Sequence, residues 1–375
     1  MADRKPPARP VRLLVVGNGP TAIGSDGEIH LERALGELLA DLTARGIEVS
    51  LLQSSVPFEP SMTYFGMTVP PGRLRLVPFA AASPWRGMLR TLLALRRADF
   101  VYIFYPGTLP RVVARLCRLT AKPYALYLRG GQFSAGRDAA LLKRARFILA
   151  VSPGILPSAA GLGGNVRIIR PMLELSPADA ARRVHRPLNG RAVRLLFIGR
   201  LEPDKGIPEL VEAMALLRAR GVPAELRLVG GGPLHAQLVE RARAEPDLGL
   251  QIEGVIGDRQ RIMQAVEQAD VFVLPTHHEG FPRVLYEAMI KSAAIVTTMV
   301  GGIPAIMRHG ENCLAVPVGD ATALADAIAA LARDHTLRQN LTNAALDTVI
   351  EVLTKRPTHV AALDEGLRAY TARGH

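Results

Sequence analysis

The amino-acid sequence predicts an α/β protein with two doubly wound domains, and three observations carry this prediction. Short apolar, β-rich segments alternate with segments whose apolar residues recur at helical spacing, which is typical of parallel sheets covered by helices. At 375 residues the chain is long for one compact core, so two domains are expected. Finally, "VRLLVVG" at 11–17 and "VRLLFIG" at 193–199 repeat each other, each an apolar run that ends in Gly. Each is therefore expected to open a domain as its first strand.

In the first half, a second strand is predicted at "VSLLQSS", residues 49–55. Residues 84–100, "PWRGMLRTLLALRRADF", predict an amphipathic helix with two kinds of side chain interleaved. The apolar ones are Trp85, Met88, Leu89, Leu92 and Leu95, and the basic ones are Arg86, Arg90, Arg96 and Arg97. Two interpretations fit this pattern: a helix that rests on anionic lipid, and a helix packed on its own sheet with exposed arginines.

The second half alternates regularly between helices and strands. The predicted helices cover 208–219, 258–269, 282–292 and 321–333, and the predicted strands cover 225–230, 250–254, 271–275, 294–298 and 313–317. The Pro-, Ala- and Arg-rich stretch from Pro171 to Asn189 lacks a strand pattern and is interpreted as a linker. We therefore expect a first Rossmann-like domain over 1–175, a linker over 176–190, a second Rossmann-like domain over 191–355 and a further helix over 358–373. Two such domains would face each other across a cleft, with ligands at the carboxyl ends of the strands.

Composition favours a cytoplasmic protein. No apolar run approaches the roughly 18 residues that span a bilayer. The apolar run after the basic N-terminus is too short for the central region of a signal peptide. The two cysteines, Cys117 and Cys313, lie in different halves, so no disulfide framework is implied and a reducing compartment fits.

The net charge of +12 is concentrated in the first half. Residues 1–190 contain 26 Lys and Arg against 12 Asp and Glu, whereas residues 191–375 contain 20 against 22. Within residues 61–150 the counts are 15 against 2. This asymmetry suggests that the first half meets an anionic partner: membrane lipid, a negatively charged acceptor or nucleic acid. An arginine-rich bias of the source proteome is the alternative explanation.

"GNGPTA", residues 17–22, fits the dinucleotide fingerprint G-x-G-x-x-G/A directly after a strand. Two features weaken the match. The second strand ends near Gln53 without the acidic residue that holds a ribose, and the chain runs past Ala22 before a helical pattern begins. We interpret the segment as a Gly-rich loop, and a nicotinamide or flavin site remains an alternative.

Three segments at predicted strand ends of the second half suit a diphosphate and a sugar. "GRLEPDKG" places Arg200 and Lys205 around a Pro-Asp turn, where a planar guanidinium and a compact ammonium can hold a diphosphate. "VGGGPL", residues 229–234, lets the backbone approach a ligand closely. For both segments an ordinary polar turn is the alternative.

The third segment is "EGFPRVLYE", residues 279–287. Pro282 suits the first position of a helix, and the N–H groups from 280 to 283 would then form an anion site. Glu279 precedes that terminus and Glu287 follows it, and either carboxylate can accept both hydroxyls of a vicinal diol. A metal site would need His277, His278 and Glu279 to converge, yet adjacent residues of an extended loop point to opposite sides. We therefore expect no metal.

Taken together, five motifs resemble the ordered signature of retaining, nucleotide-sugar-dependent glycosyltransferases of the GT-B fold, the family-four group also called glycosyl transferases group 1. They are "GRLEPDKG", "LRLVGGGP", "IEGVIGD", "ADVFVLPTHHEGFPRVLYEAM" and "GGIPAIMRHGENCLAVPVGD", over about residues 193–333. The resemblance implies that Arg200 and Lys205 hold the donor diphosphate, that Glu279 contacts the transferred sugar, and that Glu287 holds the ribose. It also implies a base beside Val255 and backbone contacts from Gly280, Phe281 and Pro282. The family needs no divalent cation or other cofactor, and its last helix crosses back to the first domain.

The first half matches the family less closely. The family's Gly-containing loop after the first strand is placed at Gly27 in "SDGEIH". Where many members carry a His near the reacting sugar, this chain has "YLRGGQF", so Arg129 stands at that position. His30 is a weaker candidate for the missing His.

The sequence thus predicts a metal-independent hexosyltransferase that moves a sugar from a nucleoside diphosphate sugar to an anionic saccharide or lipid-linked acceptor. We expect it to act in polysaccharide or glycolipid synthesis, in the cytoplasm or at the inner face of the membrane. A nicotinamide- or flavin-dependent oxidoreductase and a basic nucleic-acid-binding protein are the alternatives. The second of these lacks a recognition helix, an RNA-binding signature or a zinc module.

Overall fold

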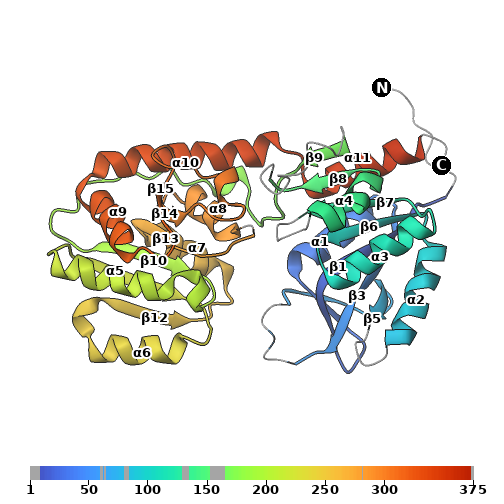
Figure 1. The fold of residues 1–375 in the computed structure, drawn as a ribbon, viewed down its shortest axis with the longest axis horizontal. Helices are drawn as coiled ribbons and strands as arrows, with labels where there is room; N and C mark the ends of the chain where they lie inside the picture. Colours follow the sequence, from blue (N-terminus) through green and yellow to red (C-terminus); the bar gives the residue numbers. More distant parts are fainter. Residues whose placement is uncertain are drawn as a thin grey trace. The chain divides into compact units, whose positions relative to one another are not determined.

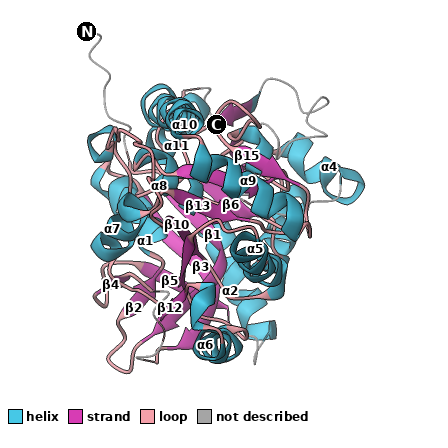
Figure 2. Cartoon of the chain, turned by 90° about the vertical axis from the view of Figure 1, so that its left-hand side faces the viewer, coloured by secondary structure: helices cyan, strands magenta, loops and turns pink. Residues whose placement is uncertain are grey.

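The fold is described from a computed structural model of the chain, which describes residues 9–59, 62, 65–79, 84–128, 135–152, 165–280 and 282–372. The chain divides into two compact units (Figure 1). Unit 1 comprises Met1–Glu174 and Pro357–His375, and unit 2 comprises Leu175–Arg356. Each unit is an α/β structure with its own sheet, shown as magenta strands among cyan helices in Figure 2. This confirms the predicted fold class.

Unit 1 is built on a mainly parallel sheet that begins with the repeated apolar segment. Strand β1 (Arg12–Ile23) lies between β3 (Glu48–Pro57) and β6 (Phe100–Tyr105). The sheet continues on one side through β5 (Arg75–Phe79) and on the other through β7 (Tyr124–Leu128), β8 (Ile148–Ala150) and β9 (Val166–Ile168). Strands β2 (Ile29–Leu31) and β4 (Met67–Val69) add an antiparallel extension to the end of β1. All six residues of β6 are buried, as expected for a strand covered on both faces.

The segment that matched the dinucleotide fingerprint forms no phosphate-binding turn. Residues 17–22 continue strand β1, which pairs with β3 on both sides of an irregularity between Val16 and Pro20. Gln53 of β3 is buried, and its Nε2 donates to the carbonyl oxygen of Pro20 at 3.1 Å. Because the chain leaves this region as strand, no helix N-terminus follows the glycines to meet a pyrophosphate. The interpretation as a Gly-rich loop was therefore wrong.

The described residues of unit 1 form five α-helices. They are α1 (Arg33–Ala44), α2 (Pro84–Arg97), α3 (Thr108–Leu119), α4 (Ala135–Arg144) and α11 (His359–Thr371). Helix α2 is shorter than the predicted 84–100, because it ends at Arg97 and Phe100 already begins β6. Helix α11 contacts α1 through the Arg45–Asp364 ion pair (3.2 Å), and Tyr370 packs edge-on against Phe100. The last helix of the chain therefore completes the core of the unit in which the chain begins.

Unit 2 contains a six-stranded, entirely parallel sheet. Its order is β12 (Leu250–Gly254), β11 (Ala224–Val229), β10 (Val193–Ile198), β13 (Val271–Leu274), β14 (Ala294–Thr298) and β15 (Leu314–Val316). The order runs outward from β10 in both directions, which is the doubly wound arrangement of dinucleotide-binding folds. Strands β13 and β14 are buried throughout, and both were predicted from their apolar runs.

Three of the six described α-helices of unit 2 begin at aspartate caps that the sequence supplies. The six are α5 (Ile207–Ala219), α6 (His235–Ala244), α7 (Arg259–Gln268), α8 (Arg283–Ile290), α9 (Ala321–Arg333) and α10 (His335–Lys355). The Asp258, Asp320 and Asp334 carboxylates accept from backbone N–H groups of the first turns of α7, α9 and α10. Helix α8 starts one residue later than predicted. Pro282 is its N-cap and not its first helical residue.

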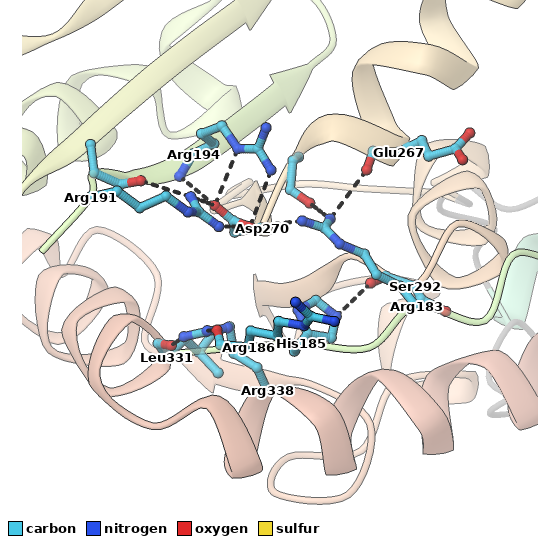
Figure 3. Close-up of polar contacts among 12 residues, drawn as sticks. Arg183, His185, Arg186, Arg191, Arg194, Glu267, Asp270, Ser292, Leu331 and Arg338 are labelled. Atoms are coloured by element: carbon cyan, nitrogen blue, oxygen red, sulfur yellow. Dashed lines mark hydrogen bonds and ion pairs between the residues drawn. The ribbon is translucent and has the colours of Figure 1, made fainter. Parts of the chain in front are cut away.

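The segment predicted as a linker, 176–190, is held against unit 2 by a buried carboxylate (Figure 3). Asp270 precedes β13 and accepts from Arg183 at 2.8 Å, Arg191 at 2.7 Å and the backbone N–H of Arg194 at 3.0 Å. Burial alone would raise the pKa of Asp270, but the hydrogen bonds from Arg191 and Arg194 outweigh it and lower that pKa well below its usual range.

In the same segment, His185 is 5% exposed, and its Nε2 lies 3.0 Å from the carbonyl oxygen of Ser292. Burial lowers the pKa of His185 to about 4, so the ring is neutral at pH 7 and donates to that carbonyl. The segment is thus a fixed part of unit 2.

Candidate active site

The predicted site residues of unit 2 gather at the carboxyl ends of β10 and β13. These two strands are neighbours, and the connections from them leave in opposite directions because the strand order reverses there. Ligands of doubly wound sheets bind at such a switch point. Residues 199–206 follow β10 and residues 275–282 follow β13, so both loops emerge at this point.

Lys205 and Glu279 meet there as an ion pair. Lys205 ends the short helix η5 (Pro203–Lys205), and its Nζ donates to Glu279 Oε2 at 2.9 Å and to the carbonyl oxygen of His278 at 3.2 Å. Their side chains are only 14% and 19% exposed. Lysine has three N–H donors, so among the described residues one remains for a ligand, as does Glu279 Oε1. The pair offers a donor and an acceptor side by side.

The loops that carry these two residues are joined by backbone hydrogen bonds. The N–H of His277 donates to the carbonyl oxygen of Asp204 at 2.8 Å, and Thr276 Oγ1 donates to the same carbonyl oxygen at 3.3 Å. Thr298 of β14 also holds the loop that carries Glu279, since its Oγ1 donates to the carbonyl oxygen of Thr276 at 2.6 Å. The position of Lys205 relative to Glu279 is therefore set by the backbone as well as by their own ion pair.

Two glycines allow these loops to approach closely. Gly206 has φ +72°, and a Cβ there would lie 2.1 Å from the carbonyl oxygen of Pro275. Gly301 has φ +56°, and a Cβ there would lie 1.6 Å from the carbonyl oxygen of Glu279. Both positions combine a left-handed backbone with a contact that excludes any side chain. They explain the glycines of "DKG" and "VGG" as requirements of the loop that holds Glu279.

Arg200 takes a different position from Lys205. It follows β10, its side chain is 67% exposed, and its Nη1 donates to Glu202 Oε1 at 2.8 Å. The structure therefore pairs Lys205 with Glu279 but pairs Arg200 with Glu202. An exposed pair of this kind is weak, so Arg200 can exchange Glu202 for a more strongly charged anion at little cost.

Val255 and the glycine turn after β11 lie together. Val255 is 63% exposed, and its Cγ2 is 2.9 Å from where a Cβ on Gly231 would be. The short apolar side chain of Val255 over a bare backbone turn forms a flat surface at the carboxyl ends of β11 and β12. Such a surface suits the face of a planar ring.

Glu287 lies within α8 and is 14% exposed. Its Oε1 accepts from Arg259 at the start of α7, at 3.2 Å. Gly280 and Pro282 lead into the N-terminus of α8, and Pro282 has no side-chain donor or acceptor with which to cap it. Phe281, the other residue predicted here, lies outside the described residues.

The predicted residues of unit 1 are described in part. Gly27 lies in the turn between β1 and β2 with φ +84°, a left-handed conformation that favours glycine. His30 of β2 stacks on Phe58 at 3.7 Å between ring centroids, and its Nδ1 lies 3.1 Å from Thr68 Oγ1. Arg129 lies outside the described residues.

Two site contacts were not predicted from the sequence. Arg259 faces Glu287, and His277 Nε2 lies 2.9 Å from Glu209 Oε1 in the first turn of α5. The signals in the sequence were the position of Arg259 directly after the Asp258 cap and the position of Glu209 four residues after Lys205. Within the described part of the chain, no group of three or more His, Cys, Asp or Glu is placed to hold a metal ion.

Comparison with known proteins gives a family for the second unit. Residues 192–334 match the family model of glycosyl transferases group 1. This match contains Lys205, Glu279, Val255 and the Arg259–Glu287 pair, together with all six strands of unit 2.

Among characterised relatives, the chain is 30% identical over 160 residues to the N-acetyl-alpha-D-glucosaminyl L-malate synthase of Bacillus anthracis, covering 42% of this chain and 40% of that protein. It is 32% identical over 197 residues to a putative colanic acid biosynthesis glycosyltransferase, WcaL, of Salmonella typhimurium, covering 49% and 45%. The chain therefore spans less than half the length of these two relatives.

Similarity to solved structures extends over both units. The crystal structure of Anabaena HepE in complex with UDP and glucose matches with a TM-score of 0.63 at 18% identity, covering 97% of this chain and all of that one. At this identity the match establishes the fold. Residues 192–334 thus match the glycosyl transferases group 1, and the chain as a whole has the GT-B fold.

Proposed function

We propose that this protein is a retaining glycosyltransferase that transfers a hexose from a nucleoside diphosphate sugar to a saccharide or lipid-linked acceptor in polysaccharide or glycolipid synthesis. The observation that carries the proposal is the Lys205–Glu279 pair at the switch point of unit 2, inside the segment that matches glycosyl transferases group 1. HepE, which has the same fold, was crystallised with UDP and glucose, and WcaL is a putative glycosyltransferase of colanic acid biosynthesis.

Each site residue has a role in this proposal that follows from its chemistry. The third N–H of Lys205 and the guanidinium of Arg200 bind the diphosphate, and the N-terminus of α8 at Gly280–Arg283 adds backbone donors. Glu279 Oε1 accepts from a hydroxyl of the transferred sugar. Glu287, oriented by Arg259, accepts from the ribose. The base lies on the flat surface made by Val255 and Gly231.

The reaction proposed is a substitution at the anomeric carbon with retention. The bond between that carbon and the phosphate oxygen breaks, and the acceptor hydroxyl oxygen bonds to the same carbon from the same face. The hydroxyl proton passes to a phosphate oxygen of the departing nucleoside diphosphate. Negative charge grows on that diphosphate in the transition state, so fixed cations beside it lower the barrier. Lys205 is already held in place, which spares the cost of ordering it during the reaction.

Replacing Lys205 tests the proposal. Lys205→Ala is expected to lower turnover about a hundredfold or more, since it removes the cation that stabilises the leaving group. Transfer from a radiolabelled nucleotide sugar, with the unfolding temperature measured in parallel, separates lost chemistry from lost folding. A Lys205→Ala variant that transfers at the wild-type rate would refute the assignment.

Lys291 provides the matched control for this substitution. It ends α8, its side chain is 17% exposed, and it pairs with Glu267 at 3.5 Å, away from the switch point. Lys291→Ala removes a lysine of similar burial that also pairs with a glutamate. We expect it to retain activity within about twofold, because its charge does not face the diphosphate.

We also propose that transfer needs no divalent cation, because Lys205 and Arg200 supply the positive charge. Turnover is then expected to stay within about twofold of its starting value after dialysis against EDTA and assay in a chelator. Loss of activity in the chelator, restored by Mg²⁺ or Mn²⁺, would show that a metal ion performs the role assigned to the two basic residues.

A further inference from the structure

Helix α2 of unit 1 is packed in an unusual way for a surface helix. Its buried face consists of Gly87, Thr91 and Leu95, at spacings of four residues. Gly87 allows this face to lie close to β5, since a Cβ there would be 2.7 Å from the Phe79 ring. Thr91 satisfies its own hydroxyl by donating to the carbonyl oxygen of Gly87 at 2.8 Å. The helix therefore packs against the unit mainly through small residues, with Leu95 as the one large side chain of its buried face.

The larger apolar side chains of α2 point the other way. Trp85 is 65% exposed, Leu89 54%, Leu92 42% and Leu93 48%. Their spacings of three, four and one residues place all four on one face of the helix, opposite the buried one. Eight large hydrophobic side chains are exposed among the described residues, and four of them lie on this single helix. Such a concentration of apolar surface marks a binding site and not the usual scatter.

The exposed apolar face is bordered by positive charge. Arg86, Arg90 and Arg97 lie along one side of it, and Arg96 lies at its C-terminal end, all exposed. Arg97 and Arg75 of the neighbouring edge strand β5 also line one cavity of about 270 Å³, whose only acidic lining residue is Glu48. The helix itself has no acidic residue. We call the apolar residues Trp85, Leu89, Leu92 and Leu93, with Arg86, Arg90, Arg96 and Arg97, the α2 surface.

We propose that the α2 surface binds the face of a bilayer that contains anionic phospholipids. Apolar side chains flanked by arginines on one side of a helix that lies flat on its domain fit the boundary between acyl chains and headgroups. Trp85, at the start of the helix, has an amphipathic ring that suits that boundary. No helix in the described part of the chain is long and apolar enough to cross a membrane, so the contact proposed is with one leaflet.

The charges favour lipid over a second copy of this chain. Two α2 surfaces brought face to face would place eight arginines around one contact without a carboxylate from either helix, which is repulsive. Anionic headgroups supply the complementary charge at any position along the helix. The excess of basic residues over 61–150, 15 against 2, extends this preference to the surrounding sequence.

Flotation with vesicles tests the proposal on the full chain. The protein is expected to float with phosphatidylcholine vesicles that contain about one-third phosphatidylglycerol, and not with pure phosphatidylcholine, at about 0.1 M salt. Arg86→Gln with Arg90→Gln should weaken the partition constant about thirtyfold, since each arginine near an anionic surface contributes a factor of about five to six. Leu89→Ser with Leu92→Ser should weaken it about tenfold or more.

Helix α3 offers a matched control, because Leu119 is 81% exposed and Arg118 beside it is exposed as well. Leu119→Ser with Arg118→Gln should leave flotation unchanged. All substituted positions are at the surface, so unfolding temperatures should match the wild type. Failure of the wild type to bind the anionic vesicles would overturn the proposal, as would equal losses in the α2 and α3 variants. Light scattering that shows a dimer dissociated by Leu89→Ser with Leu92→Ser would assign the surface to a second copy instead.

Discussion

At the scale of single residues, the two units are built around the same contact. Arg12 at the start of β1 donates its backbone N–H to Asp99 Oδ2 at 3.0 Å, and Asp99 precedes the neighbouring strand β6. Arg194 in β10 donates its backbone N–H to Asp270 Oδ2, also at 3.0 Å, and Asp270 precedes the neighbouring strand β13. The repeated "VRLL" of the sequence thus marks an arginine that each sheet uses to fix its two central strands. One further arginine, the exposed Arg9, joins Asp99 at 3.2 Å, whereas two, Arg183 and Arg191, join the buried Asp270.

This difference predicts unequal effects of the same substitution. Asp270 is 1% exposed, so Asp270→Asn leaves three arginines without their buried counter-charge and should cost about 3 kcal/mol of the stability of unit 2. Asp99 has a side chain that is 25% exposed, and Asp99→Asn should cost unit 1 about 1 kcal/mol. Urea unfolding followed by hydrogen exchange measures the two units separately. A cost for Asp270→Asn no larger than that for Asp99→Asn would show that the additional arginines stabilise nothing.

At the scale of elements, unit 2 follows closely from its sequence because its helices and strands differ sharply in period. Helix 321–333 was predicted at its observed ends, and the strands within one residue or so. Helix α10 was not predicted. Asp334 both ends α9 and caps α10, so no Gly or Pro separates the two, and the buried stripe of α10 includes Arg338 and Thr342 beside its apolar residues. A search for regularly spaced apolar residues bounded by Gly or Pro does not detect such a helix.

The contacts of the candidate site could likewise be predicted from the sequence only in part. Lys205 and Glu279 could be expected to approach each other, because loops at the carboxyl ends of adjacent parallel strands must meet. The Arg259–Glu287 contact joins two helices whose strands, β12 and β13, are not neighbours in the sheet. No local spacing encodes that contact. In unit 1, the fingerprint at 17–22 misled because a G-x-G-x-x-A string is compatible with an irregular strand as well as with a turn.

At the scale of the whole molecule, charge and chemistry are divided between the units. Residues 1–174 of unit 1 contain 23 Lys and Arg against 11 Asp and Glu, and the α2 surface lies in the same unit. The motifs shared with glycosyl transferases group 1 belong to unit 2. We therefore propose that unit 2 binds the nucleotide sugar and that unit 1 recognises an anionic acceptor. Each unit has its own sheet and core, so ligand binding to one can stabilise it separately from the other.

This division predicts where a nucleotide slows hydrogen exchange. Whichever of UDP, GDP or ADP raises the unfolding temperature should, at about a hundredfold excess over its Kd, stabilise the unit that binds it by about 2.7 kcal/mol. Mass spectrometry should then find the largest protection in 199–206, 230–232 and 275–290 of unit 2, and Lys205→Ala should reduce it, because the same ammonium binds the diphosphate in the ground state. Protection centred instead on β1 and β3 would place the nucleotide at "GNGPTA" in unit 1, and the glycosyltransferase assignment of Lys205 and Glu279 would fall with it.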